Sequence, residues 1–256
     1  MDLKFNQSGI ENYSSSSQKA RVFTESWISD NMFCPRCGNF KIEHFPNNKP
    51  VADFYCSKCM CEYELKSKNG SISKKINDGA YNTMIERING DNNPDFFFMG
   101  YSKTEMKVKN LIIIPKHFFV PEIIEKRKPL SNNARRAGWT GCNILLDKIP
   151  KQGVIEIIKN EYIVSIDDVV NKVNNAYKLE IKDLNARGWL MDILNCINLI
   201  PAQEFTLDEM YNFENILIEK HPQNNNIRPK IRQQLQLLRD KGFIEFLGKG
   251  IYRKVN

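Results

Sequence analysis

The chain has 256 residues, of which 41% are hydrophobic and 26% are charged, and its formal net charge is +7. This length fits one large domain or two small ones with a buried core. No apolar run approaches the ~20 residues that span a bilayer, and the polar N-terminus lacks the order of a signal peptide. We therefore expect a cytoplasmic protein with no membrane partner. The positive charge favours a polyanion as partner, although mildly basic enzymes are common.

Up to about residue 180 the sequence predicts strands with helices between them. Apolar residues at helical spacing indicate helices, and short apolar runs bounded by proline or polar residues indicate buried strands. The predicted helices cover residues 18–28 and 77–88, and the predicted strands cover residues 96–99, 111–114, 155–158 and 162–164. This alternation indicates an α/β layer fold.

The pattern changes in the last third of the chain. An amphipathic helix is predicted over residues 187–200 and a third helix over residues 227–241. Between them, Thr206 and Glu209 have the spacing of a capping box that opens a second helix. Two short strands around Gly248 predict a terminal hairpin. Three helices and a hairpin describe a winged helix, so we divide the chain into domains at residues 1–183 and 184–256.

Charge separates within this winged helix. Acidic residues outnumber basic ones from residue 187 to 225, and the balance reverses from residue 226 onward. The third helix and the hairpin are therefore the basic face, where such a module inserts a helix into the major groove and contacts phosphates. The candidate DNA contacts on this face are Arg228, Lys230, Arg232, Gln233, Gln234 and Lys249.

The seven cysteines are expected to be metal ligands or buried thiols and not disulfides, because thiols of a cytoplasmic protein stay reduced. Cys34 and Cys37 form one Cys-x-x-Cys pair, and Cys56 and Cys59 form a second. Four thiolates at this spacing fit a closed tetrahedral zinc site, which leaves no position for a substrate. Cys61 is an alternative to Cys59, although the Cys-x-x-Cys spacing favours Cys59. We expect structural zinc that organises its surroundings without taking part in chemistry.

The second cysteine pair lies inside a segment that also carries Asp53, Glu64 and Lys66. Two carboxylates, helped by the carbonyl of Leu65, can hold Mg²⁺, which prefers oxygen ligands. The lysine can steady a nucleophile or a developing negative charge. Glu64 and Lys66 are two residues apart, so on a strand they point to the same face. The segment predicts a phosphodiester-hydrolysing site, although a loose match to this pattern also arises by chance.

Two further basic segments are candidate DNA contacts. The run that includes Lys68 follows the catalytic triplet and is either a phosphate-tracking loop or a solvated turn. A predicted loop over residues 127–141 carries Arg135, Arg136 and Trp139. An exposed tryptophan there could stack on bases or wedge against them, whereas a buried one would pack into the core. Composition does not decide between these alternatives.

Several strings in the chain resemble the DpnI-like family of methyl-directed (type IIM) restriction endonucleases. The similarity runs from about residue 4 to residue 254 and includes both cysteine pairs, and it is weakest at residues 7–17 and 172–183. The strings that carry it are Gln18–Arg21, Pro50–Cys56, Glu64–Lys68, Ile76–Tyr81, Ala134–Trp139 and Ile231–Leu235.

The resemblance implies a PD-(D/E)XK nuclease domain followed by a winged helix. It implies Mg²⁺-dependent cleavage, by a monomer, of double-stranded DNA at GATC whose adenines carry N6-methyl groups. Carried over by motif, Asp53, Glu64 and Lys66 are the catalytic residues, and the four cysteines of the two pairs hold zinc. Trp139 looks like the residue that senses the methyl groups, and the winged helix looks like a second reader of them.

Two alternatives stay open. One is a non-catalytic regulator with a zinc element and a winged helix, which would bind DNA and leave it intact. The other is a nuclease with the same chemistry that acts on another methylated sequence.

Overall fold

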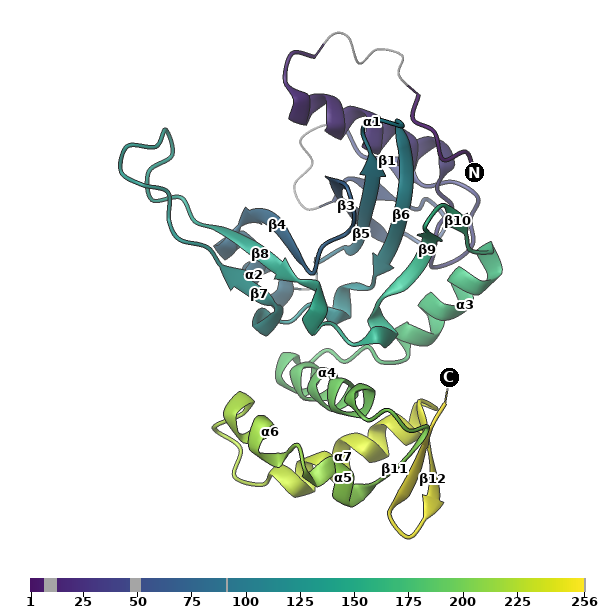
Figure 1. The fold of residues 1–256 in the computed structure, drawn as a ribbon, viewed down its shortest axis with the longest axis vertical. Helices are drawn as coiled ribbons and strands as arrows, with labels where there is room; N and C mark the ends of the chain where they lie inside the picture. Colours follow the sequence, from purple (N-terminus) through teal and green to yellow (C-terminus); the bar gives the residue numbers. More distant parts are fainter. Residues whose placement is uncertain (7–12, 47–51, 91, 256) are drawn as a thin grey trace.

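The structure, a computed structural model, describes residues 1–6, 13–46, 52–90 and 92–255. Its N-terminal part is built on a seven-stranded sheet (Figure 1). In sheet order the strands are β1 (Glu43–His44), β2 (Phe54–Tyr55), β3 (Glu62–Asn69), β5 (Asp95–Ser102), β6 (Lys107–Ile114), β9 (Ile155–Lys159) and β10 (Tyr162–Ile163). Strands β3 and β5 run parallel, and the other neighbours run antiparallel.

The strands predicted over residues 96–99, 111–114 and 155–158 are confirmed as β5, β6 and β9, and the strand predicted over residues 162–164 is the exposed edge strand β10. Residues 95–101 of β5 are all buried, which explains why Phe96–Met99 reads as a continuous apolar run. The predicted N-terminal helix is α1 (Ser16–Asn31), which packs against β1 and β3 and buries Phe23 and Trp27. Near the β10 edge of the sheet, α3 (Ile166–Tyr177) packs against β9.

A smaller sheet lies beside the large one, in the order β4-β8-β7. Its strands are β4 (Lys75–Ala80), β7 (Ile124–Lys126) and β8 (Gly141–Leu145), and α2 (Tyr81–Asn89) packs against it. The helix predicted over residues 77–88 is therefore wrong at its start, because residues 77–80 belong to β4. Pairing with β8 satisfies the backbone of these residues, and Gly79 is a poor helix former.

The C-terminal part contains the predicted winged helix. Its elements are α4 (Leu184–Leu199), β11 (Glu204–Thr206), α5 (Leu207–Tyr211), α6 (Glu214–Lys220), α7 (Ile227–Asp240), β12 (Ile244–Gly248) and β13 (Ile251–Lys254). The predicted second helix is split into α5 and α6, and β11 adds a third strand to the hairpin. The capping box is confirmed, because the Thr206 hydroxyl accepts from the Glu209 N–H at 3.1 Å and the Glu209 carboxylate accepts from the Thr206 N–H at 2.7 Å.

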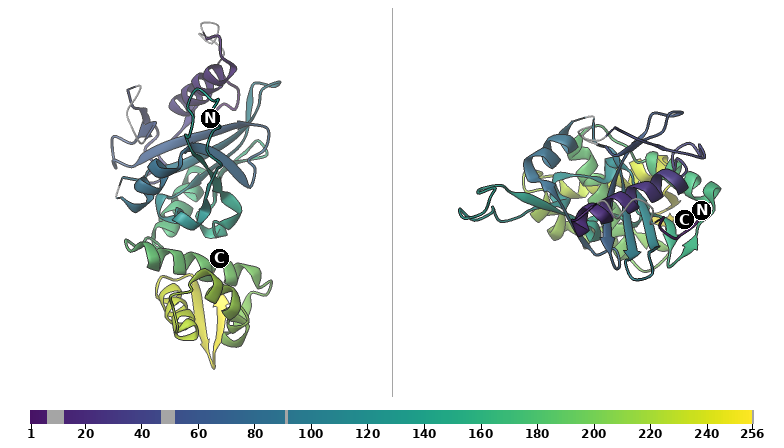
Figure 2. Two further views of the ribbon diagram at one scale, coloured as in Figure 1. Left: turned by 90° about the vertical axis from the view of Figure 1, so that its left-hand side faces the viewer. Right: turned by 90° about the horizontal axis from the view of Figure 1, so that it is seen from above.

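Helix α4 is the element of the C-terminal part that faces the N-terminal part (Figures 1 and 2). It is held to the first part by hydrogen bonds, including one from Arg187 to the Phe119 carbonyl at 3.3 Å and a reciprocal amide pair between Asn198 and Gln152 at 2.9 and 3.1 Å. Single-turn 3-10 helices complete this region at Lys116–Phe118, Pro121–Ile123, Leu146–Lys148 and Lys151–Gly153. Across the described ranges, the helices are all too short or too polar to cross a membrane.

Candidate active site and metal centre

The carboxylate of Asp53 lies at the edge of strand β3 and is hydrogen-bonded to it. Strand β2 pairs with β3 as far as Tyr63, whose carbonyl accepts from the Asp53 N–H at 2.9 Å. The next N–H on this edge, that of Leu65, donates to Asp53 Oδ2 at 2.8 Å. The N–H and C=O of one strand residue point to the same edge, so the Leu65 carbonyl faces the side on which Asp53 lies.

Glu64 and Lys66 extend from β3 on one face, and each has a second partner from another element. The ammonium of Lys66 lies 2.6 Å from Glu64 Oε1 and also pairs with Asp78 of β4. Glu64 pairs in turn with Arg87 of α2. The result is a chain of alternating charges, Arg87–Glu64–Lys66–Asp78, in which every side chain is less than one-fifth exposed.

The surroundings of these side chains set their protonation. Burial raises the pKa of Asp53, and the charge of Glu64 adds to this rise, against the opposing effects of the Leu65 N–H and Lys66. Burial lowers the pKa of Lys66, but the carboxylates of Glu64 and Asp78 outweigh that effect, and the pKa ends above its ordinary value. Lys66 is therefore a fixed cation. A proton acceptor in its place would need a lowered pKa.

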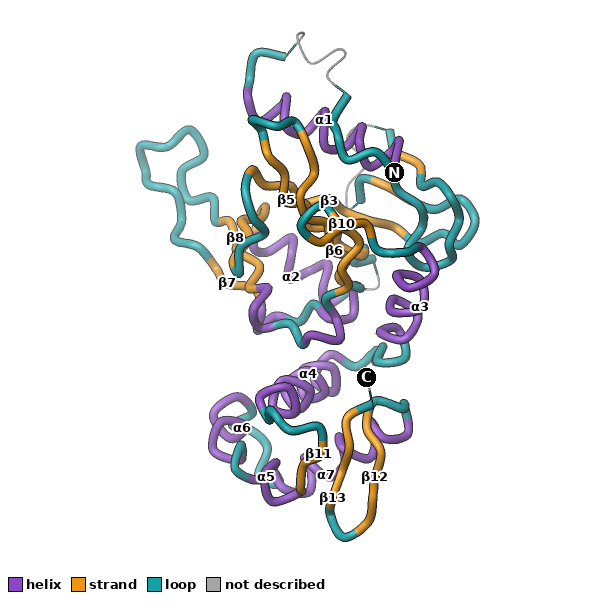
Figure 3. The backbone as a smooth tube through the Cα atoms, turned by 45° about the vertical axis from the view of Figure 1, so that its right-hand side comes forward, coloured by secondary structure: helices purple, strands orange, loops and turns teal. Residues whose placement is uncertain are grey.

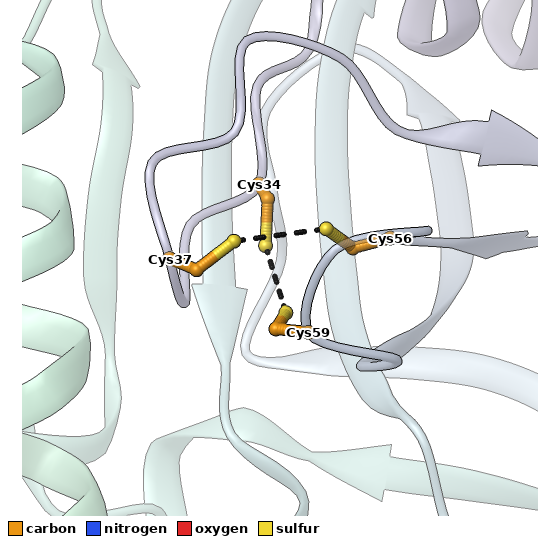
Figure 4. Close-up of side chains that lie close together, drawn as sticks. All are labelled: Cys34, Cys37, Cys56 and Cys59. Atoms are coloured by element: carbon orange, nitrogen blue, oxygen red, sulfur yellow. Dashed lines mark hydrogen bonds between the residues drawn. The ribbon is translucent and has the colours of Figure 1, made fainter.

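Four cysteine side chains converge from two separate turns (Figure 4). Cys34 and Cys37 come from the turn after α1, and Cys56 and Cys59 come from the turn between β2 and β3. Their sulfur atoms all lie within 4.8 Å of one another, with Cys34 Sγ 3.5 Å from Cys59 Sγ and Cys37 Sγ 3.7 Å from Cys56 Sγ. Cys61 is not part of this group, which consists of the two Cys-x-x-Cys pairs and so contains Cys59.

The cysteine cluster has the dimensions of a zinc site. Zn–S bonds of about 2.3 Å give a tetrahedron with edges of about 3.8 Å, close to the separations of 3.5 and 3.7 Å between these sulfur atoms. The Tyr63 hydroxyl lies 3.0 Å from Cys34 Sγ, and an Asn39 N–H donates to Cys56 Sγ at 3.8 Å, as is typical around metal-bound thiolates. Burial acts to raise the pKa of Cys56, but backbone N–H groups and neighbouring thiols lower it to about 7, whereas burial raises the pKa of Cys34 and that of Cys59. With these dimensions the cluster could hold zinc.

This cluster fixes the segment that carries the acidic residues. Asp53 precedes β2, the second cysteine pair follows β2 directly, and Glu64 lies on β3 after the turn. A tetrahedral ion would join this turn to the loop after α1 and so fix the distance between Asp53 and Glu64. The first residues of the matching string, Pro50 and Val51, lie outside the described residues.

The chain matches two protein-family models, which together cover almost its whole length. A model described as DpnI, Dam-replacing family, matches residues 1–182, and one described as DpnI_C, Dam-replacing HTH domain, matches residues 185–254. The chain belongs to the DpnI family. Membership makes it a restriction endonuclease with a C-terminal DNA-binding HTH domain, and it agrees with the mixed α/β architecture and the cysteine cluster.

The HTH domain of this DpnI-family chain presents most of its predicted DNA contacts on the exposed side of α7. Arg228, Arg232 and Gln233 are exposed there, Lys230 is half-buried, and Lys249 is exposed in the turn between β12 and β13. Two of the arginines are held by neighbours on α5 and α6. Arg228 pairs with Glu214 at 2.8 Å, and Arg232 donates to the Tyr211 hydroxyl at 3.2 Å.

Gln234 does not fit its predicted role as a DNA contact. It is only 3% exposed and lies on the buried face of α7 with Ile231, Leu235 and Leu238. Its position follows the helical period, since residues three and four apart share a face. Glutamine is polar and is therefore expected at the surface, but the helical period places the side chain of Gln234 on the buried face of α7.

Trp139 lies on a hairpin that projects from the small sheet between β7 and β8 (Figures 1 and 3). It is half-buried and is not part of the hydrophobic core, while Arg135 and Arg136 beside it are exposed. The guanidinium of Arg136 lies 5.3 Å from the centre of the indole. A Cβ atom at Gly141 would meet the indole at 2.9 Å, so this glycine allows the ring to lie over the start of β8. The core-packing alternative is therefore wrong.

Sequence reasoning missed Asp78 and Arg87, the outer members of the charge chain. Both belong to a segment that was predicted as helix, and their partners on β3 are distant in sequence. Ile76–Tyr81 is one of the strings that carry the family resemblance, and it was the available signal for Asp78. Lys68 is exposed near the end of β3, where it donates to the Ser73 hydroxyl at 3.0 Å.

Proposed function

We propose that this chain is a methyl-directed restriction endonuclease of the PD-(D/E)XK type. In this proposal it hydrolyses phosphodiester bonds of double-stranded DNA at GATC whose adenines carry N6-methyl groups, with Mg²⁺ as cofactor. The observation that carries the proposal is the arrangement on β3. Asp53 accepts from the Leu65 N–H at the edge of β3, and Glu64 extends from the same strand 2.6 Å from the cationic ammonium of Lys66. The proposed domains are residues 1–183 and 184–256, and the proposed active form is a cytoplasmic monomer.

The proposed roles follow from charge and donor type. Asp53, Glu64 and the Leu65 carbonyl would hold Mg²⁺, which when bound polarises a phosphate and acidifies a bound water. Lys66 carries a fixed positive charge in a site where burial strengthens electrostatic interactions. In this proposal the ammonium stabilises the negative charge that develops on the phosphate oxygens during hydrolysis. The cysteine cluster with zinc holds the segment in shape and takes no chemical step.

Trp139 is the proposed reader of the methyl groups in the catalytic domain. The N6-methyl groups of a fully methylated GATC lie in the major groove, where a flat apolar surface gains about 0.8 kcal/mol for each methyl-sized group that it buries. Two methyl groups and the accompanying desolvation reach the ~1–3 kcal/mol expected for a distinction at one base pair. The projecting hairpin and the half-exposed indole support this role. A second reading by the winged helix would multiply the discrimination.

We expect Trp139→Ala to lower cleavage of methylated GATC by about 10-fold, because roughly 1.5 kcal/mol of methyl contact is lost. The variant should stay folded, since the indole lies outside the core. The measurement is the initial cleavage rate of a methylated duplex at subsaturating enzyme. Tyr162→Ala, which removes an aromatic ring that is 73% exposed on β10, is the matched control and should cut at the wild-type rate. An unchanged rate in Trp139→Ala would remove this residue from methyl reading.

The proposed function is tested by digesting one plasmid prepared from an adenine-methylating host and from a non-methylating host. With Mg²⁺ present, only the methylated plasmid should be cut, and the fragments should match the spacing of GATC. Equal cleavage of both preparations would refute methyl dependence. Methyl-dependent cleavage at other positions would favour a nuclease with another methylated target. Binding that leaves both plasmids intact would favour a non-catalytic regulator.

A further inference from the structure

The ammonium of Lys66 has two carboxylate partners, and only one of them belongs to the proposed metal site. Glu64 lies 2.6 Å from the Lys66 ammonium, but it also pairs with Arg87 and would be a ligand of the cation. Asp78 pairs with Lys66 and is not one of the proposed ligands. When Glu64 is engaged by the cation, Asp78 is therefore the partner that still holds the lysine.

Asp78 reaches Lys66 from a different sheet. Lys66 lies on β3 of the large sheet, whereas Asp78 lies on β4 of the small sheet. Strand β4 is itself fixed by its pairing with β8, in which Asp78 is opposite Cys142, and the register shifts between Asp78 and Ala80. The Tyr81 N–H also donates to the Thr140 carbonyl at 3.0 Å, just after Trp139. The Lys66–Asp78 pair is thus a tie between the strand of the site and the sheet that carries the hairpin.

The Lys66–Asp78 ion pair is largely shielded from solvent, so it can fix the position of the Lys66 side chain. The side chain of Asp78 is 6% exposed and that of Lys66 is 18% exposed. A lysine side chain has many rotamers, so a cation on so flexible a stem needs an anchor to stay in a productive place. Small misplacements of a catalytic group are costly for rate, because the contact must be in place when charge develops.

We propose that Asp78 is a positioning residue, which holds the Lys66 ammonium against the reacting phosphate while Glu64 serves the cation. This inference rests on the proposed function above. Asp78 acts through Lys66 and touches neither DNA nor the cation. Its loss should therefore slow the chemical step without weakening the binding of substrate.

The test compares the steady-state cleavage of a methylated GATC duplex by wild type, Asp78→Asn and Asp78→Glu. Asp78→Asn keeps the shape and removes the charge, so we expect kcat to fall at least 10-fold with KM within twofold of wild type. Asp78→Glu keeps the charge, so its kcat should be at least threefold above that of Asp78→Asn. If Asp78 only filled space, Asp78→Glu should have a lower kcat than Asp78→Asn, because glutamate is larger than asparagine and would fit a packed site less well.

Glu125→Gln is the control, since it breaks an exposed ion pair with Lys75 in the same small sheet and should leave kcat unchanged. If thermal melting shows Asp78→Asn to be unfolded, Asp78→Ser takes its place. A kcat within twofold of wild type in the uncharged variant, or an Asp78→Glu no faster than that variant, would overturn the inference while the wild type still cuts. A wild type that cuts no duplex would instead refute the proposed function, and the inference with it.

Discussion

Lys66→Ala is expected to reduce cleavage of methylated DNA by a factor of about 10²–10³ or more while binding persists. Removing one group that stabilises charge in a transition state costs roughly 3–4 kcal/mol. Glu64 and Asp78 hold Lys66 as a cation, so its loss would remove that charge from the proposed reaction site. In the proposed function, binding depends mainly on the basic face of the HTH domain and on the hairpin, which are separate from β3. The measurements are single-turnover cleavage with Mg²⁺ and a gel shift without it.

Lys159→Ala is the matched control for this change. Lys159 is 60% exposed on β9 and pairs with Glu156 of the same strand, so its removal should leave the cleavage rate unaltered. Melting curves of both variants separate chemistry from folding, because Lys66→Ala leaves a shielded Asp78 without its cation. Wild-type cleavage by a folded Lys66→Ala would show that the proposed site is not where the reaction occurs.

Loss of the metal from the cysteine cluster is expected to have the second large effect, on stability. Structural zinc contributes about 10–16 kcal/mol of apparent binding free energy in small zinc domains, so weakening it removes a large part of local folding energy. We expect Cys37→Ser to lower the zinc content and the melting temperature, by roughly 10 °C for a loss of a few kcal/mol. A chelator should have a similar effect on the wild type.

Cys61→Ser is the matched control, because Cys61 is equally half-buried and close in sequence but is outside the cluster. It should keep zinc and melt with the wild type. The measurements are zinc per chain by elemental analysis and thermal melting followed by circular dichroism. Purified wild type without zinc, or an equal destabilisation by Cys61→Ser, would contradict the assignment of the four ligands.

Sequence patterns predicted those parts of the fold that depend on interactions between residues close together in the sequence. The central strands follow from continuous apolar runs, as at Phe96–Met99, and the capping box follows from Thr206 and Glu209 three residues apart. The cysteine cluster follows from the spacing of two Cys-x-x-Cys pairs, because that motif already fixes half of a tetrahedral site. For the same reason, Asp53, Glu64 and Lys66 could be selected before their geometry was known.

What could not be predicted depends on contacts between distant segments. Residues 77–80 continue the helical spacing of α2, and only pairing with β8 makes them a strand. The partners Asp78 and Arg87 are visible only when β4 and α2 are placed beside β3. Gln234 is a different case, since the buried period of Ile227, Ile231 and Leu238 on α7 already contains the information that places it inside.

In the proposed function, the site around Asp53, Glu64 and Lys66 cuts DNA only where adenine is methylated. The most direct test of this proposal is a time course with end-labelled duplexes that contain one GATC, either fully N6-methylated or unmethylated, with and without Mg²⁺. We expect cleavage at GATC of the methylated duplex alone, only when Mg²⁺ is present, and a strongly reduced rate with Lys66→Ala. Equal cleavage of the two duplexes by the wild type, or cleavage of neither, would contradict it.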